Sequence, residues 1–337
     1  MTGMRCLLMA LALPVLLPVL LPVLLPVLLP ALLIWAQPAP AQQVDGSYGS
    51  DLGNPRQLLG SGWLMTNDVL GDNQDRWRTG GVSISQAFGP VWMGQAPAEF
   101  GSLFELRLQA QVIQPDVLTR YNAYDRRYAG VLSIGLHNHV QRGAHEYVLG
   151  GDLVMVGPRT KLDDVQAALH DVFGGSSPAA AVRAAQIGNR LRPTAVLEYG
   201  RRISVAPTVT LRPFAEARMG DETMARLGVD LEFGRMWNLG LMARDSVTGY
   251  RYPVVNRAAA GPAFVLGADT AYVTDSVYLP RDGGAAQLEP NRNRVRAGLH
   301  YQQGSLSFFY GAAWLGREFT TQPESQLVGA IQVQLRF

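Results

Sequence analysis

The chain of 337 residues has almost no cysteine and almost no lysine. Its only cysteine is Cys6, close to the start, and its only lysine is Lys161. A chain body without cysteine cannot be held by disulfide bonds and has no thiol nucleophile. The 29 basic and 27 acidic residues nearly cancel, so charge gives no indication of nucleic-acid binding. Contacts with an anionic partner would be made by arginine, whose planar guanidinium group donates two parallel hydrogen bonds to phosphate.

Charge is also missing from the first part of the chain, where Arg5 is the only charged residue before Asp45. The apolar run that follows Arg5 contains four PVLL repeats and ends at Ala39-Pro40-Ala41, a signal-peptidase motif. The run is long enough for a membrane-spanning helix. Prolines at every fourth position and the cleavage motif favour a secretory signal peptide instead. We therefore expect a signal peptide at residues 1–41 and one domain at residues 42–337.

Apolar and polar residues alternate along most of that domain. In Phe104–Ile113, for example, apolar side chains at every second position are separated by Glu, Arg and Gln. A strict period of two gives each strand one apolar and one polar face. The pattern predicts twelve strands, at 62–68, 77–88, 101–114, 127–141, 145–157, 192–204, 206–218, 224–234, 263–278, 292–303, 305–317 and 327–337. The long segment 235–262 has no clear place in this scheme unless it hides a further strand pair.

Two architectures produce this alternation, a soluble sandwich and a transmembrane barrel. Strands of roughly 10–13 residues suit a tilted crossing of a bilayer. The chain ends in an amphipathic strand with Phe337 as its last residue, as outer-membrane barrels commonly do. Aromatic residues near the strand ends are typical of interfacial girdles; they are Trp63, Trp77, Trp92, Tyr147, Tyr199, Tyr272, Tyr278, Tyr301 and Trp314. The pattern favours an all-β, twelve-stranded antiparallel barrel in the outer membrane.

The stretch Val156–Gly175 departs from the strand pattern. Apolar residues recur there at helical spacing after Gly157-Pro158, and Gly174-Gly175 ends the run. The spacing predicts a short helix in the third outer loop. Gln166 and His170 are four residues apart, so they share one face of that helix. Taken alone, a histidine such as His170 is more often an ordinary residue of a helix surface than a catalytic base.

In an antiparallel barrel all odd-numbered strands run in the same direction, so the loops after strands 1, 3 and 5 lie at the same end. All three of these loops are polar. With both termini in the periplasm, the connections Asn67–Arg78, Pro115–Arg126 and the helical loop all lie at the outer rim. The first is rich in Asp and Asn, and such oxygen ligands suit Ca²⁺, although a polar turn has the same composition. We expect Glu318 and Glu324, near the last outer loop, to be solvated. His137, His139, His145 and His300 are interpreted as structural.

Three segments together resemble a known family. The hairpin TNDVLGDNQDRWRTGG, the segment VGPRTKLDDVQAALHDVFG and the final REFTTQPESQLVGAIQVQLRF resemble the outer-membrane lipid A 3′-O-deacylases. In the second segment, the spacing from Pro158 to Gln166 to His170 agrees with the family pattern without a gap. The resemblance implies a twelve-stranded barrel whose active site lies between the wall and a helix in an outer loop. It also implies a Ca²⁺-dependent esterase that removes the 3′-linked acyloxyacyl chain of lipid A.

By the same resemblance, Asn67, Asp68, Thr79 and His170 match essential positions of the family. Asp68 would bind Ca²⁺, which would polarise the ester carbonyl, and His170 would take a proton from water. Gln166 would orient His170, and Thr79 would position substrate or water. A family lysine in the second outer loop has no counterpart, and Arg120 lies at about the right place to replace it. No G-x-S-x-G motif is present, which argues against an acyl-enzyme.

The partners expected on this basis are lipid A, or lipopolysaccharide, and the outer membrane. A monomer is expected, with no nucleic-acid partner and an active site that faces the cell exterior. Two other functions remain open from the sequence. The chain could be an inactive barrel of the same family with a structural or channel role, or it could be an outer-membrane phospholipase.

Overall fold

A computed structural model describes residues 56–238, 240–255, 260–282, 284–304 and 306–335. The expected signal peptide, residues 1–41, and the terminal Phe337 lie outside the described residues. The chain divides into two compact units, and each is described by itself. One contains residues 54–163 and 178–337, and the segment 164–177 belongs to the other.

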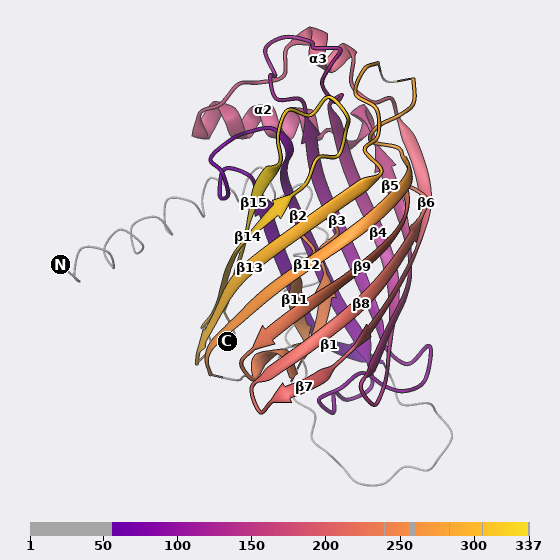
Figure 1. Cartoon of the computed structure of the whole chain (residues 1–337), viewed down its shortest axis with the longest axis vertical. Coiled ribbons are helices and arrows are strands. Elements are labelled where there is room, and N and C mark those ends of the chain that lie inside the picture. Colours follow the sequence, from indigo (N-terminus) through magenta and orange to yellow (C-terminus); the bar gives the residue numbers. More distant parts are fainter. Residues whose placement is uncertain (1–55, 239, 256–259, 283, 305, 336–337) are drawn as a thin grey trace, which may run out of the picture. The chain divides into compact units, whose positions relative to one another are not determined.

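The larger unit is a closed antiparallel β-barrel (Figure 1). Its wall consists of β1 (Gln57–Asn67), β2 (Trp77–Gly89), β3 (Phe104–Gln114), β4 (Ala129–Arg142), β5 (His145–Val156), β6 (Arg190–Arg201), β8 (Val209–Met219), β9 (Glu222–Phe233), β12 (Gly261–Ser276), β13 (Asn291–Gln303), β14 (Leu306–Leu315) and β15 (Gln326–Leu335). Pairing of β6 with β8 and of β1 with β15 closes the ring. The short β7 (Ile203–Ala206) follows β6 and pairs with β8. The prediction of twelve wall strands is confirmed, although β1 begins at Gln57 rather than at residue 62.

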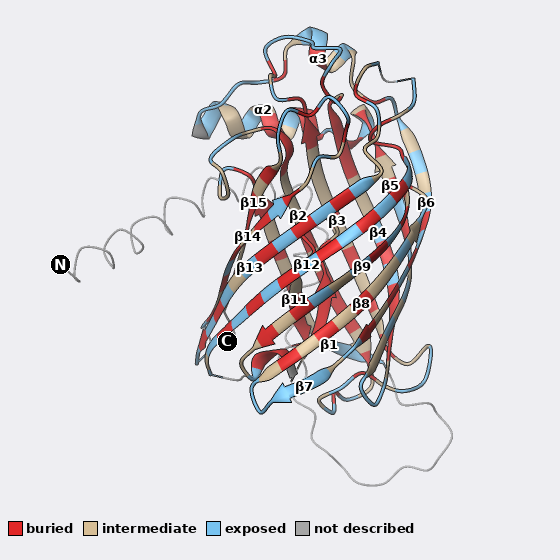
Figure 2. Ribbon diagram, viewed as in Figure 1, coloured by how far each residue is buried: buried red, intermediate tan, exposed pale blue. Residues whose placement is uncertain are grey.

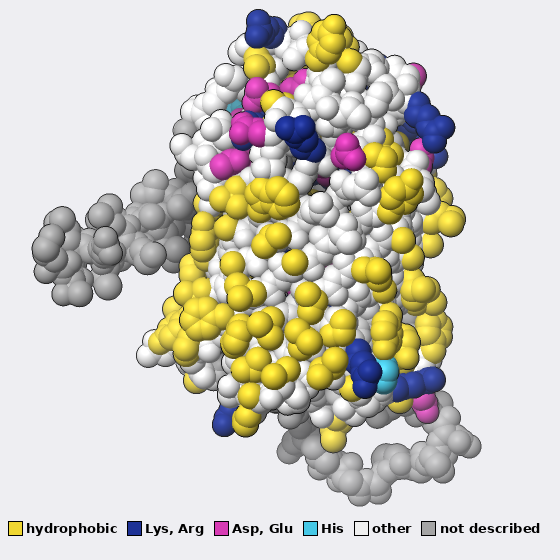
Figure 3. All heavy atoms as spheres, in the orientation of Figure 1, with side chains coloured by type: hydrophobic (Ala, Val, Ile, Leu, Met, Phe, Trp, Pro, Cys, Tyr) yellow, Lys and Arg dark blue, Asp and Glu magenta, His cyan; other side chains and the backbone are white. Residues whose placement is uncertain are grey.

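The two faces of the wall are reversed relative to a soluble protein. Apolar side chains such as Leu136, Leu227 and Leu266 are about half exposed or more, whereas charged ones such as Glu105 and Arg296 are buried. Along each strand the two classes alternate (Figure 2). Figure 3 shows apolar side chains spread over the wall and charged ones gathered near the ends. Apolar atoms therefore face lipid and charges face the lumen, as expected for a transmembrane barrel and not for a sandwich.

Part of the predicted aromatic girdle is wrong. Tyr147, Tyr272, Tyr301 and Trp314 are exposed on the wall, as a girdle requires. Trp77, Trp92 and Tyr278 are buried instead and contribute to the interior. Proximity to a strand end does not tell which way a side chain points when the strand begins with a bulge or the residue lies in a loop.

The segment 235–262, unplaced by the sequence, contains a hairpin inside the barrel. After the short 3₁₀ helix η2 (Met236–Asn238), β10 (Leu241–Arg244) pairs with β11 (Arg251–Val255), apart from the wall sheet. The hairpin contacts several strands of the wall. The Ser83 hydroxyl of β2 donates to Asp245 over 3.1 Å, and the Tyr250 hydroxyl bonds Ala297 and Ala312 carbonyls of β13 and β14. We call residues 241–255 the plug.

Two glycines of β1 allow the plug to approach the wall. A Cβ atom at Gly62 would lie 2.0 Å from the carbonyl oxygen of Pro253, and one at Gly60 would lie 2.5 Å from that of Val254. Neither distance is tolerable between non-bonded atoms, so only glycine fits where β11 packs against β1. The plug's apolar residues then join an interior cluster that includes Tyr252, Val254 and Phe309.

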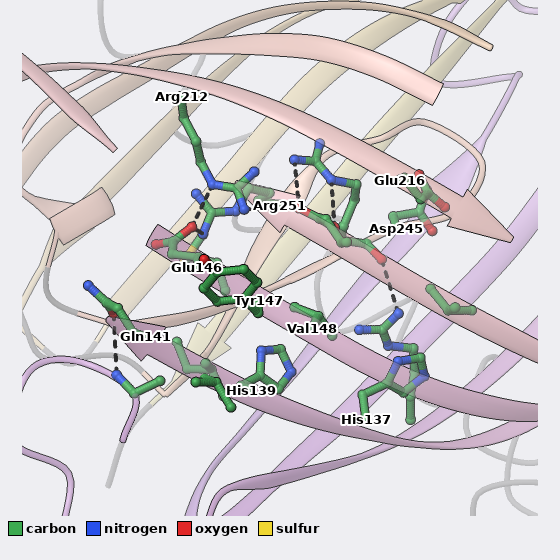
Figure 4. Close-up of a pocket in the computed structure, with 18 of the residues that line it drawn as sticks. His137, His139, Gln141, Glu146, Tyr147, Val148, Arg212, Glu216, Asp245 and Arg251 are labelled. Carbon is green, nitrogen blue, oxygen red and sulfur yellow. Dashed lines mark hydrogen bonds and ion pairs between the residues drawn. The ribbon is translucent and has the colours of Figure 1, made fainter. Parts of the chain in front are cut away.

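Around the plug, the lumen is crossed by a network of buried ion pairs (Figure 4). Arg244 of the plug pairs with Glu198 at 3.2 Å and with Asp230 at 3.0 Å. Arg251 of the plug reaches Glu146 at 3.4 Å and Glu232 at 2.8 Å. Because these carboxylates lie on β5, β6 and β9, the network fastens the plug to the wall. A buried charge that loses its partner is costly, so the pairs hold the hairpin in one position.

The connection between β5 and β6 contains helices (Figure 1). It begins with η1 (Pro158–Thr160), continues with α2 (Leu162–Phe173) and ends with α3 (Ala180–Ala184). Gly157 has a φ of 107°, and a Cβ atom there would lie 2.8 Å from Asn189 backbone nitrogen. Glycine is therefore required at the start of this loop. No helix among the described residues is long and apolar enough to span a membrane.

Candidate functional site

Asp68 is the centre of a buried polar cluster just after the end of β1. It follows β1, and its side chain is fully buried. Its carboxylate accepts a hydrogen bond from the Arg76 backbone N–H at 2.7 Å, from the Thr79 hydroxyl at 3.1 Å and from the Gln326 amide at 3.2 Å. The structure therefore brings together Asp68 and Thr79, two of the residues that the sequence singled out.

A bulge at the start of β2 makes this contact possible. Pairing between β2 and β3 shifts register between Trp77 and Gly80, and Trp77 has a positive φ of 51°. As a result three consecutive side chains, Trp77, Arg78 and Thr79, are all buried, which a regular strand does not allow. The bulge turns Thr79 towards Asp68 while Arg78 enters the lumen.

Asp75 and Gln114 complete the cluster. The Thr79 hydroxyl lies 2.5 Å from a carboxylate oxygen of Asp75, and the Gln114 amide donates to that oxygen over 2.9 Å. Three carboxylates therefore lie in one loop, because Asp72 is also present and accepts from the backbone N–H of Leu327. Burial raises the pKa of Asp68 to about 7, and the neighbouring charges of Asp75 and Asp72 add to the increase.

The donor set of this cluster fits a hard cation. A buried carboxylate beside two others is stabilised in its charged form by a nearby positive ion, and oxygen ligands are those that Ca²⁺ prefers. Within the described residues, no group of three His, Cys, Asp or Glu side chains is close enough to enclose a metal. A cation at Asp68 would therefore need further oxygen ligands from hydroxyl, carbonyl, water or substrate.

Asn67 ends β1 immediately before Asp68, but its side chain has a local role. Its amide oxygen accepts a hydrogen bond from the backbone N–H of Val69 at 2.8 Å, which closes a turn. This turn leads the chain into the loop, where the Asp68 carbonyl accepts from the N–H groups of Gly71, Asp72 and Asn73. Asn67 therefore shapes the loop that buries Asp68.

Arg120 is exposed in the connection between β3 and β4 and has no hydrogen bond or ion pair with the described residues. The buried arginine of this connection is Arg126, whose guanidinium contacts Glu318 at 2.5 Å. Glu318 is itself largely buried, so the expectation that it is solvated is wrong. Its charge is compensated by arginines from distant strands, which the sequence could not reveal. Glu324 is exposed, as expected.

Gln326, which sequence reasoning missed, links the cluster to its surroundings. It begins β15, and its amide donates to Asp68 and to the Arg76 carbonyl, while its oxygen accepts from the Arg78 backbone N–H. The only available signal was its position in the final segment that resembled the deacylases.

His170 and Gln166 lie on α2, in the smaller compact unit. Within that unit, Nδ1 of His170 lies 2.8 Å from the carbonyl oxygen of Ser176. A carbonyl can only accept, so in the neutral ring Nδ1 carries the proton and Nε2 is the basic atom. The turn that brings Ser176 back depends on Gly174 and Gly175, both with positive φ. The contact with Ser176 thus fixes the tautomer of the neutral His170 ring.

Comparisons with known proteins bear on this site. The model of a family described as "Outer membrane protein LpxR" matches residues 27–337. Among solved structures, LpxR from Salmonella typhimurium is similar at 16% identity, with a TM-score of 0.68 over 82% of this chain and 100% of that one. The β domain of the Bordetella autotransporter BrkA matches at 13% identity with a TM-score of 0.42, covering 82% of this chain and 99% of that one. No curated protein sequence matches.

Proposed function

Because this chain belongs to the family of the outer membrane protein LpxR, we propose that it is a lipid A deacylase of the outer membrane. In this proposal it hydrolyses the ester that links the 3′ acyloxyacyl chain to the sugar. The observation that carries the proposal is the buried Asp68 carboxylate, held by Thr79 and Gln326 at one end of a lipid-embedded barrel. A carboxylate so placed has little value for stability but can hold a cation against a lipid ester.

Ca²⁺ is the proposed cofactor, and Asp68 is its proposed ligand, with Thr79 and Asp75 supplying nearby oxygens. When bound, Ca²⁺ supplies a positive charge that polarises the ester carbonyl and stabilises the oxyanion. The oxygen chemistry of the cluster supports this assignment. Asn67 supports it indirectly, since it shapes the turn that buries Asp68.

His170 is the proposed general base. Its Nδ1 proton is held by the Ser176 carbonyl, so Nε2 accepts the proton of the attacking water. Gln166, one turn earlier on α2, is the proposed orienting residue. Arg120, exposed in the second upper loop, is the proposed contact to the anionic head of the substrate, in the position where the deacylases have a lysine. The protein is proposed to act as a monomer.

The upper end of the barrel in Figure 1, which bears Asp68, is proposed to face the cell exterior. Lipopolysaccharide occupies the outer leaflet, so a site at this end meets its substrate without extracting it across the membrane. The plug argues against a channel as the alternative role, because its hairpin and ion pairs occupy the lumen.

Mass spectrometry of lipid A from cells with and without the protein tests the proposal. Loss of a 3′ acyl chain in the wild type, and its retention with His170→Ala, is the expected result. An unchanged lipid A profile in the presence of added Ca²⁺ would contradict it. Release of fatty acid from phosphatidylethanolamine by the purified protein would instead identify a phospholipase.

A further inference from the structure

A second polar chamber lies in the lumen between the tip of the plug and the upper end of the barrel. Its wall includes Arg78, Arg292, Arg294, Glu222, Glu318 and Tyr278. Ser246 and Val247 of the plug tip form part of its boundary. We call it the arginine chamber. It is distinct from the cluster around Asp68, since none of the residues that bond the Asp68 side chain lines it.

The chamber holds more positive than negative charge around its central carboxylate. Glu318 is contacted by Arg78 at 3.0 Å, by Arg126 at 2.5 Å and by Arg292 at 3.4 Å. Glu222 is shared between Arg78 at 4.0 Å and Arg292 at 2.8 Å. Three guanidinium groups from β2, β13 and the connection after β3 therefore face two carboxylates, which leaves one positive charge unbalanced.

Several guanidinium N–H groups in and beside the chamber are buried, with no hydrogen-bond partner among the described residues. They are Nε and Nη2 of Arg292, Nε and Nη2 of Arg126, and Nη2 of Arg294. All three side chains are more than nine-tenths buried. Buried donors in a native protein are almost always paired. Burial lowers the pKa of Arg126 below its usual value, and repulsion by Arg78 and Arg292 adds to the decrease despite the attraction of Glu318.

Other carboxylates are nearby but already engaged. Arg294 bonds Asp269 through Nε at 2.9 Å and the Ser246 and Val247 carbonyls through Nη1. Asp221 binds Arg218 at 2.7 Å and the Tyr278 hydroxyl at 2.6 Å. Arg292 and Arg294 are two residues apart on β13, so their side chains, with the unpartnered donors, lie on the same face of that strand.

Gln326 connects the chamber to the Asp68 cluster. Its amide donates to the Asp68 carboxylate, and its oxygen accepts from the backbone N–H of Arg78, whose side chain lines the chamber. The Asp68 cluster, which is the proposed cation site, therefore lies beside the arginine chamber. Lipid A is a phosphorylated sugar in which a phosphate neighbours the acylated position, so its head needs both kinds of contact.

We propose that the arginine chamber is a phosphate-binding subsite, in which Arg292, with Arg294, takes a phosphate group of the glycolipid head. This rests on the proposed function for the source of the phosphate, but not for the binding itself. Guanidinium groups with free paired donors match phosphate oxygens in geometry and charge.

The test uses the full-length protein in detergent with Arg292→Gln, and Arg212→Gln as its control. Arg212 is equally buried and also pairs with two glutamates, but it lies on β8 and does not line the chamber. Binding of inorganic phosphate, followed by ³¹P NMR, should weaken about tenfold with Arg292→Gln, the loss of a charge-assisted bond. It should be unchanged with Arg212→Gln. Wild-type protein that binds no phosphate overturns the proposal, whether or not it hydrolyses lipid A.

Kinetics identify the source of the phosphate. With phosphorylated lipid A, Arg292→Gln should raise KM about tenfold and leave kcat nearly unchanged, whereas with dephosphorylated lipid A the two proteins should have equal KM. An equal rise for both lipids overturns the assignment to the lipid phosphate. Arg292→Lys, which retains the charge, should recover part of the affinity. If phosphate binds as expected but no lipid is cleaved, the proposed function fails and the subsite stands.

Discussion

At the scale of single residues, two buried carboxylates, those of Glu318 and Asp68, have opposite surroundings and opposite pKa shifts. Glu318 is surrounded by arginines that hold its pKa well below the usual range despite its burial. Asp68 has no guanidinium on its carboxylate, only neutral donors and two acidic neighbours, and its pKa rises to about 7. The charge of one carboxylate is compensated by arginines of the protein, whereas the other is the carboxylate that we propose binds a cation.

Asp68→Asn should abolish hydrolysis while the barrel still folds. The amide has nearly the same shape, and the loss of an uncompensated buried charge does not destabilise the fold. We expect activity to fall by about a hundredfold or more, measured as free fatty acid released from lipid A in detergent. The heat-modifiable mobility of the folded barrel on gels is the control. A fully active variant would remove Asp68 from the site.

His170→Ala should reduce kcat by about 10²–10⁴-fold with little change in KM, because a general base acts on the transition state. Gln166→Ala should have a smaller effect, since it only orients the base. Steady-state kinetics on purified lipid A measures both. Equal losses in the two variants would speak against a direct proton transfer to His170.

Glu318→Gln should destabilise the upper end by about 3–5 kcal/mol, because three buried arginines then lose a shared partner. The pKa of Glu318 is lowered in the folded protein, so its contribution is complete above about pH 4.5 and is lost as pH falls below it. Urea unfolding followed by tryptophan fluorescence at pH 7 and at lower pH measures this. Glu324→Gln, at an exposed ion pair, should cost less than about 1 kcal/mol.

At the scale of elements, the plug is the hairpin that fills the lumen of the barrel. It is a two-stranded hairpin, and such a hairpin has little stability alone. Here it is held by wall hydrogen bonds from Ser83 and Ser85 and by the ion pairs of Arg244 and Arg251. The hairpin is therefore stabilised by its contacts with the surrounding barrel and not by its own strand pairing.

Replacing residues 235–262 by a short Gly-Ser turn should open the barrel to ions. The wild type should show no steady conductance in planar bilayers, because the hairpin crosses the lumen. The shortened protein should conduct, since inward-facing charges would then line a water-filled space. Arg244→Gln, which loosens the plug without removing it, is the companion variant if the deletion does not assemble. Steady conductance by the wild type would contradict the placement of the plug.

The wall could be predicted from the sequence because its signal is local, since a period of two needs only neighbouring residues. The plug could not. Its strands are short, Pro253 lies within one of them, and its partners lie far away in sequence. Asp68, Thr79 and His170 were singled out because the segments that contain them resemble the deacylase family. Gln326 and the arginine environment of Glu318 were missed, because they depend on which strands meet across the barrel.

At the scale of the whole molecule, the distribution of apolar and charged residues determines which face of the wall contacts lipid and which faces the lumen. Leu227 lies near the middle of β9 and is exposed on the wall, whereas Leu306 lies at the end of β14. Leu227→Arg should cost about 2–4 kcal/mol in a bilayer and Leu306→Arg about 0–1 kcal/mol. Unfolding by guanidinium in lipid vesicles checks the difference. Equal costs would mean that the wall does not face lipid.

The hairpin in the lumen also sets the order in which the molecule can be assembled. It precedes β12–β15 in the chain, yet Tyr250 at its tip bonds to β13 and β14. The ring closes where Met65–Asn67 of β1 meet Gly329–Ile331 of β15. An enclosed interior cannot be filled from the side, so these contacts must form while the sheet is still open. The last step of insertion into the membrane is therefore the pairing of β1 with β15, which closes the barrel around an interior that is already packed.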